Sequence, residues 1–153
     1  MVEMLGVLAI IGVLSVGGIA GYSLSMRRHR ANGVTDIVSK YALILYNQCQ
    51  QKILNGEITG ESSSEIMGCE GTRLIKFSDA GVGAMPAGVS SIVGGGVRND
   101  EKTGVDTSNV AVKFSDMKLC KAVESITGTS YSSTGQSECE RFDGYITISI
   151  KQN

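Results

Sequence analysis

The chain has 153 residues, a formal net charge of −1 and four cysteines. Its near-neutral charge gives no electrostatic footprint for general nucleic-acid binding, which needs a basic face, so no nucleic-acid partner is predicted. Beyond an apolar N-terminal segment of about 26 residues, the remaining length suits one soluble domain with a single core.

Residues 1–26 are the most distinctive segment. Between Met4 and Met26 there is no charged residue, and as an α-helix this run is roughly 34 Å long, enough to cross a bilayer. Glu3 lies at the start of the run, where burying a lone carboxylate costs several kcal/mol. Glu3 therefore needs a cationic partner, and the nearest is an amino terminus, either that of its own Met1 or that of a neighbouring copy.

The sequence Val-Glu-Met-Leu-Gly-Val-Leu-Ala-Ile-Ile-Gly-Val-Leu at residues 2–14 resembles the N-terminal signature of type IV pilins and pseudopilins. The resemblance is strong over residues 2–24. It implies a precursor in the bacterial inner membrane, cleavage by a prepilin peptidase, methylation of the new N-terminus and export by the pilus assembly machinery. It also implies that Glu3 pairs with a neighbouring subunit's terminal amine as subunits stack into an extracellular helical filament.

The segment departs from the family in one respect. Four residues precede the glutamate in type IV pilins, whereas only Met1 and Val2 precede Glu3 here. Either two residues of the mature chain are absent from this numbering, or processing differs.

A secretory signal peptide and a plain membrane anchor are the alternatives for this segment. A signal peptide usually begins with basic residues and ends at a small-x-small cleavage site, whereas this segment begins with Glu3. Periodicity does not separate a plain anchor from a filament helix, but glycines that let helix backbones approach closely favour protein contact over lipid contact alone. These glycines are Gly6, Gly12, Gly17, Gly18 and Gly21.

Three of these glycines, Gly17, Gly18 and Gly21, also weaken the helix. Each costs about 1 kcal/mol of helix propensity relative to alanine. The pilin resemblance implies an extended, non-helical stretch near residues 15–22 in packed subunits. A straight helix, with the glycines serving only close packing, is the alternative.

A basic cluster follows the apolar segment at Arg27, Arg28, His29 and Arg30. Under the positive-inside rule these residues hold the following domain in the cytoplasm, which conflicts with an exported domain. A removed basic leader resolves the conflict, and the arginines then face anionic groups of neighbouring subunits or of the outer leaflet. His29, the only histidine, is interpreted as a solvated residue.

Residues 34–54 are predicted to continue the helix with one apolar face. Apolar side chains recur there at spacings of three and four, and Asn55-Gly56 is a stop signal. The predicted architecture is one helix from residue 1 to about 54, apolar in residues 1–26 and amphipathic in residues 27–54. Its second half is predicted to pack on the sheet of a head formed by residues 55–153.

The head is predicted to contain a small antiparallel sheet, which makes the fold α+β. Predicted strands are Arg73–Phe77, Val89–Val93, Asn109–Phe114 and Tyr145–Ile150. A short helix capped by Ser115 or Asp116 is predicted to reach about Ile126 and to end at Gly128.

Three polar or glycine-rich stretches are predicted to be surface loops. They are residues 56–71, Gly94–Gly104 and Thr127–Ser137. The second superficially resembles a phosphate-binding loop, but Glu101 occupies the position before Lys102 where that loop requires glycine, and its carboxylate repels phosphate.

The four cysteines are predicted to form disulfides, since all follow the apolar segment and an exported head meets an oxidising compartment. Four cysteines allow three pairings. We favour the nearest-neighbour pairs Cys49–Cys69 and Cys120–Cys139, and the C-terminal loop closed by the second pair also resembles pilins. No cysteine pair has the close spacing of a zinc site.

The sequence contains no recognisable catalytic arrangement. The only histidine adjoins the apolar segment, so a serine or cysteine nucleophile lacks its usual partner, and no enzyme activity, metal or cofactor is predicted. The favoured function is a structural one, the main subunit of a type IV pilus-like filament. The alternatives are a pseudopilin of a type II secretion system and, from another class, a monomeric membrane-tethered binding domain.

Overall fold

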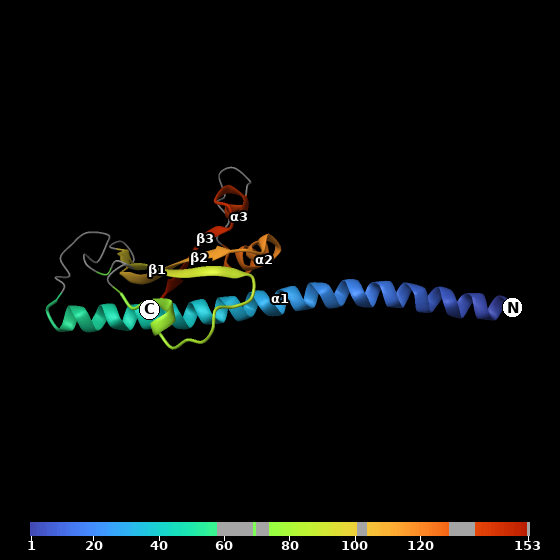
Figure 1. Ribbon diagram of the computed structural model, residues 1–153, viewed down its shortest axis with the longest axis horizontal. Helices are drawn as coiled ribbons and strands as arrows, with labels where there is room; N and C mark the ends of the chain where they lie inside the picture. The colour runs from blue at the N-terminus through green and yellow to red at the C-terminus, as the bar shows by residue number, and fades with distance from the viewer. Residues whose placement is uncertain (58–68, 70–73, 101–103, 129–136, 153) are drawn as a thin grey trace.

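A computed structural model describes residues 1–57, 69, 74–100, 104–128 and 137–152. One long helix lies along a small antiparallel sheet, so the predicted α+β fold is confirmed (Figure 1). The elements are α1 (Val2–Leu54), the 3-10 helix η2 (Phe77–Asp79), β1 (Val89–Asp100), β2 (Val105–Phe114), α2 (Met117–Thr127), α3 (Glu138–Arg141) and β3 (Tyr145–Lys151). The strands lie in the order β1-β2-β3, and both neighbouring pairs are antiparallel.

Helix α1 is continuous from Val2 to Leu54, as predicted. It ends at Asn55, whose N–H donates to the carbonyl of Gln51, and Gly56 follows with φ of +72°. The segment 15–22 is helical in this single chain. The extended stretch predicted there concerns packed subunits, so it stays a prediction.

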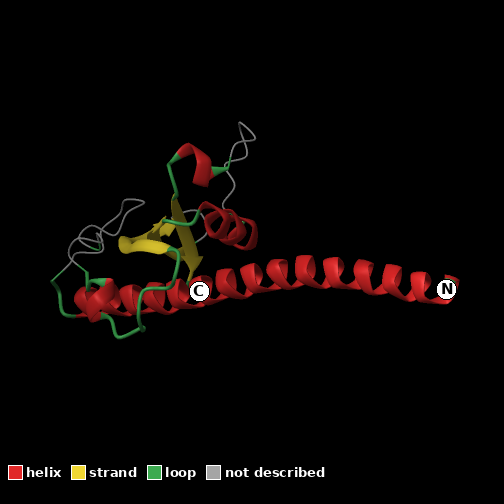
Figure 2. Cartoon of the chain, turned by 45° about the vertical axis from the view of Figure 1, so that its right-hand side comes forward, coloured by secondary structure: helices red, strands yellow, loops and turns green. Residues whose placement is uncertain are grey.

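The second half of α1 buries one face against the sheet. That face consists of Ala31, Val34, Val38, Tyr41, Ala42, Leu45 and Cys49, all at most 1% exposed. Residues alternate between buried and more exposed along β2 and over most of β3, so each strand directs one set of side chains at the helix. The first half of α1 projects away from these contacts (Figure 2).

Helix α2 lies beside α1 at the end of the sheet nearer the projecting segment (Figure 1). The carboxylate of Asp116 accepts hydrogen bonds from the backbone N–H groups of Lys118 and Leu119, at 3.0 and 3.4 Å. Gly128 ends the helix in the left-handed conformation. Both predicted helix boundaries are therefore confirmed.

The predicted strand Arg73–Phe77 is wrong. Arg73 lies outside the described residues, the next three form no strand, and Phe77 begins η2. The reason is that Ile75 bonds to helix side chains rather than to a strand: its N–H donates to Gln48 Oε1 at 2.7 Å, and its carbonyl accepts from the Tyr41 hydroxyl at 2.8 Å. The apolar run anchors a loop on α1.

The prediction that Gly94–Gly104 is an exposed loop is also wrong for its first half, because β1 continues to Asp100. A Cβ added at Gly94 lies 2.9 Å from Leu45 Cδ1, and one at Gly95 lies 3.2 Å from the carbonyl oxygen of Asn109. The glycines are required because β1 passes close to α1 and β2, and they do not mark a turn.

Both predicted disulfides are present. Cys49–Cys69 joins α1 to the chain before the sheet, and Cys120–Cys139 joins α2 to α3. The predicted loops at 56–71 and at Thr127–Ser137 lie mostly outside the described residues.

Candidate functional site: an exposed apolar rod

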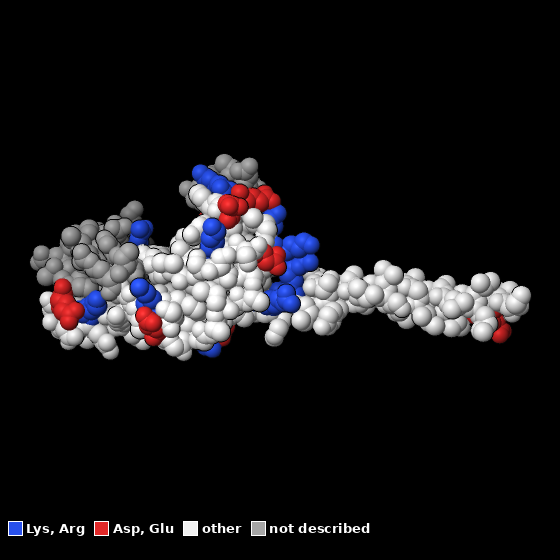
Figure 3. Space-filling model, in the orientation of Figure 1, with Lys and Arg blue, Asp and Glu red and all other residues white. Residues whose placement is uncertain are grey.

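The most unusual surface of the molecule is the first half of α1, residues 2–26, hereafter the rod. Every residue of the rod is exposed, including Leu8 at 65% and Ile19 at 73%. Figure 3 shows the rod without basic or acidic atoms along its length, except for acidic atoms at its tip. No other described part of the chain covers it.

The rod is apolar on all sides, which distinguishes it from the helix of an ordinary soluble domain. A helix at a protein surface has one apolar stripe, whereas a helix that is apolar all round is normally buried. The rod belongs to the one described helix that is long and apolar enough to cross a membrane. It is therefore compatible with membrane anchoring, and in water it requires a cover of lipid or of other protein.

The tip of the rod carries Met1 and Glu3, the two residues predicted to act in assembly. Met1 is the N-cap of α1, and Glu3 lies in its first turn, where the partial positive charge of the helix N-terminus favours a carboxylate. Within the described part of the chain, no cationic group forms an ion pair with Glu3. The geometry leaves the Glu3 carboxylate available to a group on another molecule.

Glycines open part of the rod's backbone to close approach. At about 100° per residue, Gly6, Gly17 and Gly21 lie within roughly 60° of one another around the helix. A Cβ added at any of the three meets nothing within 4 Å. A second helix can approach the backbone along this line more closely than it can approach leucine or isoleucine side chains.

Where the rod meets the head, basic side chains from two helices gather (Figure 3). We call this group the basic collar: Arg27, Arg28 and Arg30 of α1, with Lys118 and Lys121 of α2. All five side chains are exposed. The arginines follow from the sequence, but the two lysines join them only because α2 packs against α1, a tertiary contact with no local sequence signal.

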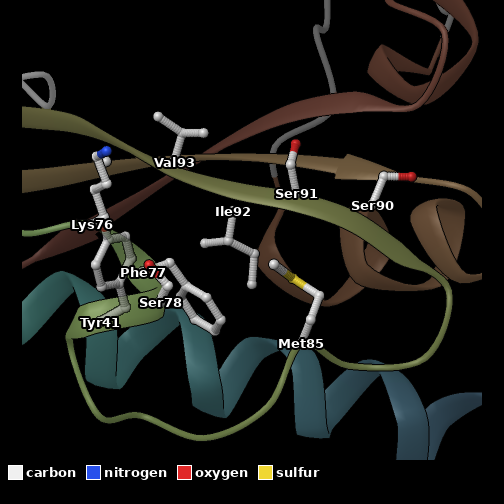
Figure 4. Close-up of a pocket in the computed structure, with 10 residues that line it drawn as sticks. Tyr41, Lys76, Phe77, Ser78, Met85, Ser90, Ser91, Ile92 and Val93 are labelled. Atoms are coloured by element: carbon white, nitrogen blue, oxygen red, sulfur yellow. The ribbon is translucent and has the colours of Figure 1, made fainter.

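The head carries one further notable feature, a largely apolar pocket of about 480 Å³ between η2 and β1 (Figure 4). Tyr41, Phe77, Met85 and Ile92 supply most of its wall, and Lys76 stands at one side. The lining offers serine hydroxyls and one amine but no carboxylate or imidazole. It suits an apolar ligand better than acid–base chemistry.

Perturbed tyrosines in the head have structural explanations. Burial raises the pKa of Tyr41, whose ring also contacts Phe77 edge-on at 5.4 Å between centroids. Burial also raises the pKa of Tyr46, and so does its hydrogen bond to Asp106 Oδ2 at 3.0 Å. Among the described residues, no three histidine, cysteine or acidic side chains gather as metal ligands.

No family model, curated protein or solved structure matches this chain. The proposed function is therefore based on the geometry of the rod, its tip and the collar.

Proposed function

We propose that this protein is a structural subunit of a type IV pilus-like filament, in which the rods of many copies pack into a central helix bundle. One observation carries the proposal: the rod is apolar on every side, exposed along its whole length, and carries at its tip a carboxylate that forms no ion pair among the described residues. The resemblance of residues 2–24 to type IV pilins supports the same function.

The driving force for assembly is an exchange of surroundings. In the precursor, inner-membrane lipid covers the rod, and in the filament the rods of other copies replace the lipid. Against water, either cover contributes about 25 cal/mol for each Å² of apolar surface. Free subunits are therefore insoluble outside both environments, and the assembly machinery must transfer each rod directly from lipid to filament.

Glu3 gives the packing its register. A carboxylate among apolar rods is tolerated only beside a cation, and in a bundle of identical chains the candidate cation is the terminal amine of a neighbour. The pairing holds neighbouring rods at the axial offset at which this amine reaches the carboxylate. A larger offset places Glu3 against uncharged side chains.

The test is the substitution Glu3→Ala in cells that carry the assembly machinery. We expect the variant to accumulate in the membrane at the wild-type level while the yield of extracellular filaments falls at least about tenfold, since loss of a desolvated ion pair costs several kcal/mol. Electron microscopy of sheared surface material measures the filaments, and immunoblotting of membranes measures the precursor.

The matched control is Glu57→Ala, which removes an exposed acid just beyond the other end of α1. It should assemble like the wild type. Normal filaments from the Glu3→Ala chain would contradict the proposed role of the carboxylate.

A monomeric membrane-tethered binding domain is the second candidate, and the apolar pocket between η2 and β1 favours it (Figure 4). In that case Glu3→Ala changes nothing, and the purified chain stays a detergent-solubilised monomer. Substituting Met85, an exposed residue that lines the pocket, would instead impair ligand binding.

A further inference from the structure

Two surface pockets lie beside α1 at the junction of rod and head. One has a volume of about 440 Å³ and the other of about 480 Å³. Arg27 and Lys118 line both pockets, Arg30 lines the first, and Arg28 and Lys121 line the second. Both pockets are thus parts of the basic collar.

Most of the collar's positive charge is not balanced by ion pairs within the part of the chain that the structure describes. Among the described residues, Arg27, Arg28, Arg30 and Lys118 form no ion pair. Lys121 pairs with Glu140. The one acid that lines either pocket, Asp116, accepts hydrogen bonds from the first turn of α2. Arg27 and Arg30, three residues apart on one helix, repel each other unless an anion lies between them.

The pockets combine this charge with apolar walls. Tyr22 and Met26 of the rod line the first pocket, and Leu24 and Ile126 line the second. Each pocket therefore combines basic side chains with apolar ones, which come from the rod and from α2. A molecule with an anionic group next to a hydrocarbon portion fits this arrangement better than a free inorganic anion does.

The position of the collar along the helix specifies the ligand further. Arg27 lies roughly 36 Å from Glu3, slightly more than the roughly 30 Å hydrocarbon core of a bilayer. With the rod in a membrane, Glu3 lies at one interface and the collar at the headgroup layer of the other. Tyr22 then lies where aromatic side chains favour the interface.

We propose that the basic collar binds the phosphate groups of anionic phospholipids, one beside each pocket, with guanidinium groups as the main ligands. Arginine suits phosphate because its planar group donates two parallel hydrogen bonds. The inference rests on the proposed function only in requiring a membrane-embedded rod. It assigns a lipid-binding role to arginines that the positive-inside rule would place on the cytoplasmic side.

Native mass spectrometry of the full-length chain in a nonionic detergent tests this binding. Phosphatidylglycerol and phosphatidylcholine with identical acyl chains are titrated separately, and bound lipids are counted. Each basic residue near an anionic surface contributes roughly a fivefold factor in binding. We expect phosphatidylglycerol to bind at least about tenfold more tightly than phosphatidylcholine, with up to two tightly bound molecules per chain.

The test variant is Arg27→Gln/Arg28→Gln/Arg30→Gln, for which we expect about 100-fold weaker phosphatidylglycerol binding. The loss for phosphatidylcholine should be much smaller, because its choline cation offsets the charge of its phosphate. Its charge-matched control, Lys40→Gln/Arg98→Gln/Lys151→Gln, removes three exposed basic residues away from the collar and from the apolar pocket and should bind like the wild type. A third variant with the three arginines replaced by lysine should retain most of the affinity. Far-UV circular dichroism of each variant should match the wild type, because all substituted side chains are exposed.

Three results would overturn the inference. Equal binding of the two lipids would show that general hydrophobicity causes the binding. Equal losses in the collar variant and the charge-matched control would show that net charge causes it. Full competition by millimolar inorganic phosphate would show a simple anion site. None of these measurements requires polymerisation. A negative lipid-binding result would therefore contradict the lipid-binding proposal alone, whereas normal filaments from the Glu3→Ala chain would contradict the proposed role of Glu3 in assembly.

Discussion

The two halves of α1 have the same backbone conformation in opposite surroundings. In the second half, Val34, Tyr41 and Leu45 are at most 1% exposed, whereas in the rod Val13 and Ile19 are more than 70% exposed. A single helix therefore connects a conventional protein core to a surface that the chain leaves open. Local sequence determines the helix, but its surroundings depend on what lies beside it.

The difference is visible in the pattern of apolar residues. In the second half the buried positions recur mainly at three- and four-residue spacings, as on one face of a helix. In the rod most positions on every side are apolar, so the helix has no polar face to direct toward water. The head should therefore obtain its stability from its own contacts, and the rod should contribute to assembly and membrane insertion instead.

The strongest test of this division compares two leucine truncations in the same helix. Leu45→Ala removes a side chain that is 0% exposed, and should lower the free energy of unfolding of the head by about 2–5 kcal/mol. Leu8→Ala, at a residue 65% exposed, should change it by less than about 0.5 kcal/mol. Chemical denaturation in nonionic detergent, followed by tyrosine fluorescence, measures both. Similar losses from the two variants would show that the rod supports the head after all.

The disulfides give the next largest effect and should also act on the head alone. Cys120 and Cys139 are 19 residues apart, and opening a loop of that length costs about 3 kcal/mol in the chain-entropy model. We expect the Cys120→Ser/Cys139→Ser chain to unfold at a correspondingly lower denaturant concentration. Its partition into membranes, measured by flotation with vesicles, should equal that of the wild type because the rod is unchanged. Loss of flotation would mean that rod and head are energetically coupled.

The sequence was sufficient wherever local chemistry decides the structure. The boundaries of α1, the Asp116 cap, the Gly128 terminus and the last strand depend on nearby residues and were predicted. The rod and its terminal acid could be identified for the same reason. The cysteine pairs followed from proximity along the chain.

The wrong predictions concern segments whose structure depends on contacts with residues distant in the sequence. The predicted strand containing Ile75 failed because Tyr41 and Gln48, on α1, take both of its backbone hydrogen bonds. The predicted loop at Gly94 failed because close packing against Leu45 requires glycine within the strand. The lysines of the collar were missed because the position of α2 beside α1 depends on tertiary packing.

Glycine substitutions test the same difference between head and rod, with smaller expected changes in stability. Gly144 in the head has φ of +84°, and an added Cβ would lie 2.7 Å from the carbonyl oxygen of Phe114, so Gly144→Ala should destabilise the head by about 1–3 kcal/mol. Gly18→Ala in the rod meets open space and should stabilise the helix by about 1 kcal/mol. Denaturation of the purified chain measures the first effect, and helicity in detergent measures the second.

The filament gives Gly18→Ala a second readout. If residues near 15–22 unwind into an extended conformation when subunits pack, a more stable helix opposes that change and lowers the filament yield. An unchanged yield with increased helicity would instead support a straight rod within the bundle.

The smallest expected effect is a pH dependence confined to the head. Burial raises the pKa of Glu138, and the nearby carboxylate of Glu124 raises it further, while Arg141 opposes the shift. The folded head therefore holds this proton to a higher pH than the unfolded chain does. Its contribution to stability is complete below the ordinary pKa of glutamate and is lost as pH rises through the raised value.

Glu138→Gln removes this titration and should make the head slightly more stable than the wild type at neutral pH, with the difference disappearing at about pH 4 and below. Denaturation midpoints across this pH range measure the change. The neighbouring Glu140→Gln is the control, because Glu140 is exposed and pairs with Lys121, so its removal should give no stabilisation at neutral pH. Residues 4–26 contain no carboxyl group, so the same pH dependence should persist in a chain that lacks the rod. A dependence that vanished with the rod would place the titrating contact between the two regions and contradict their independence.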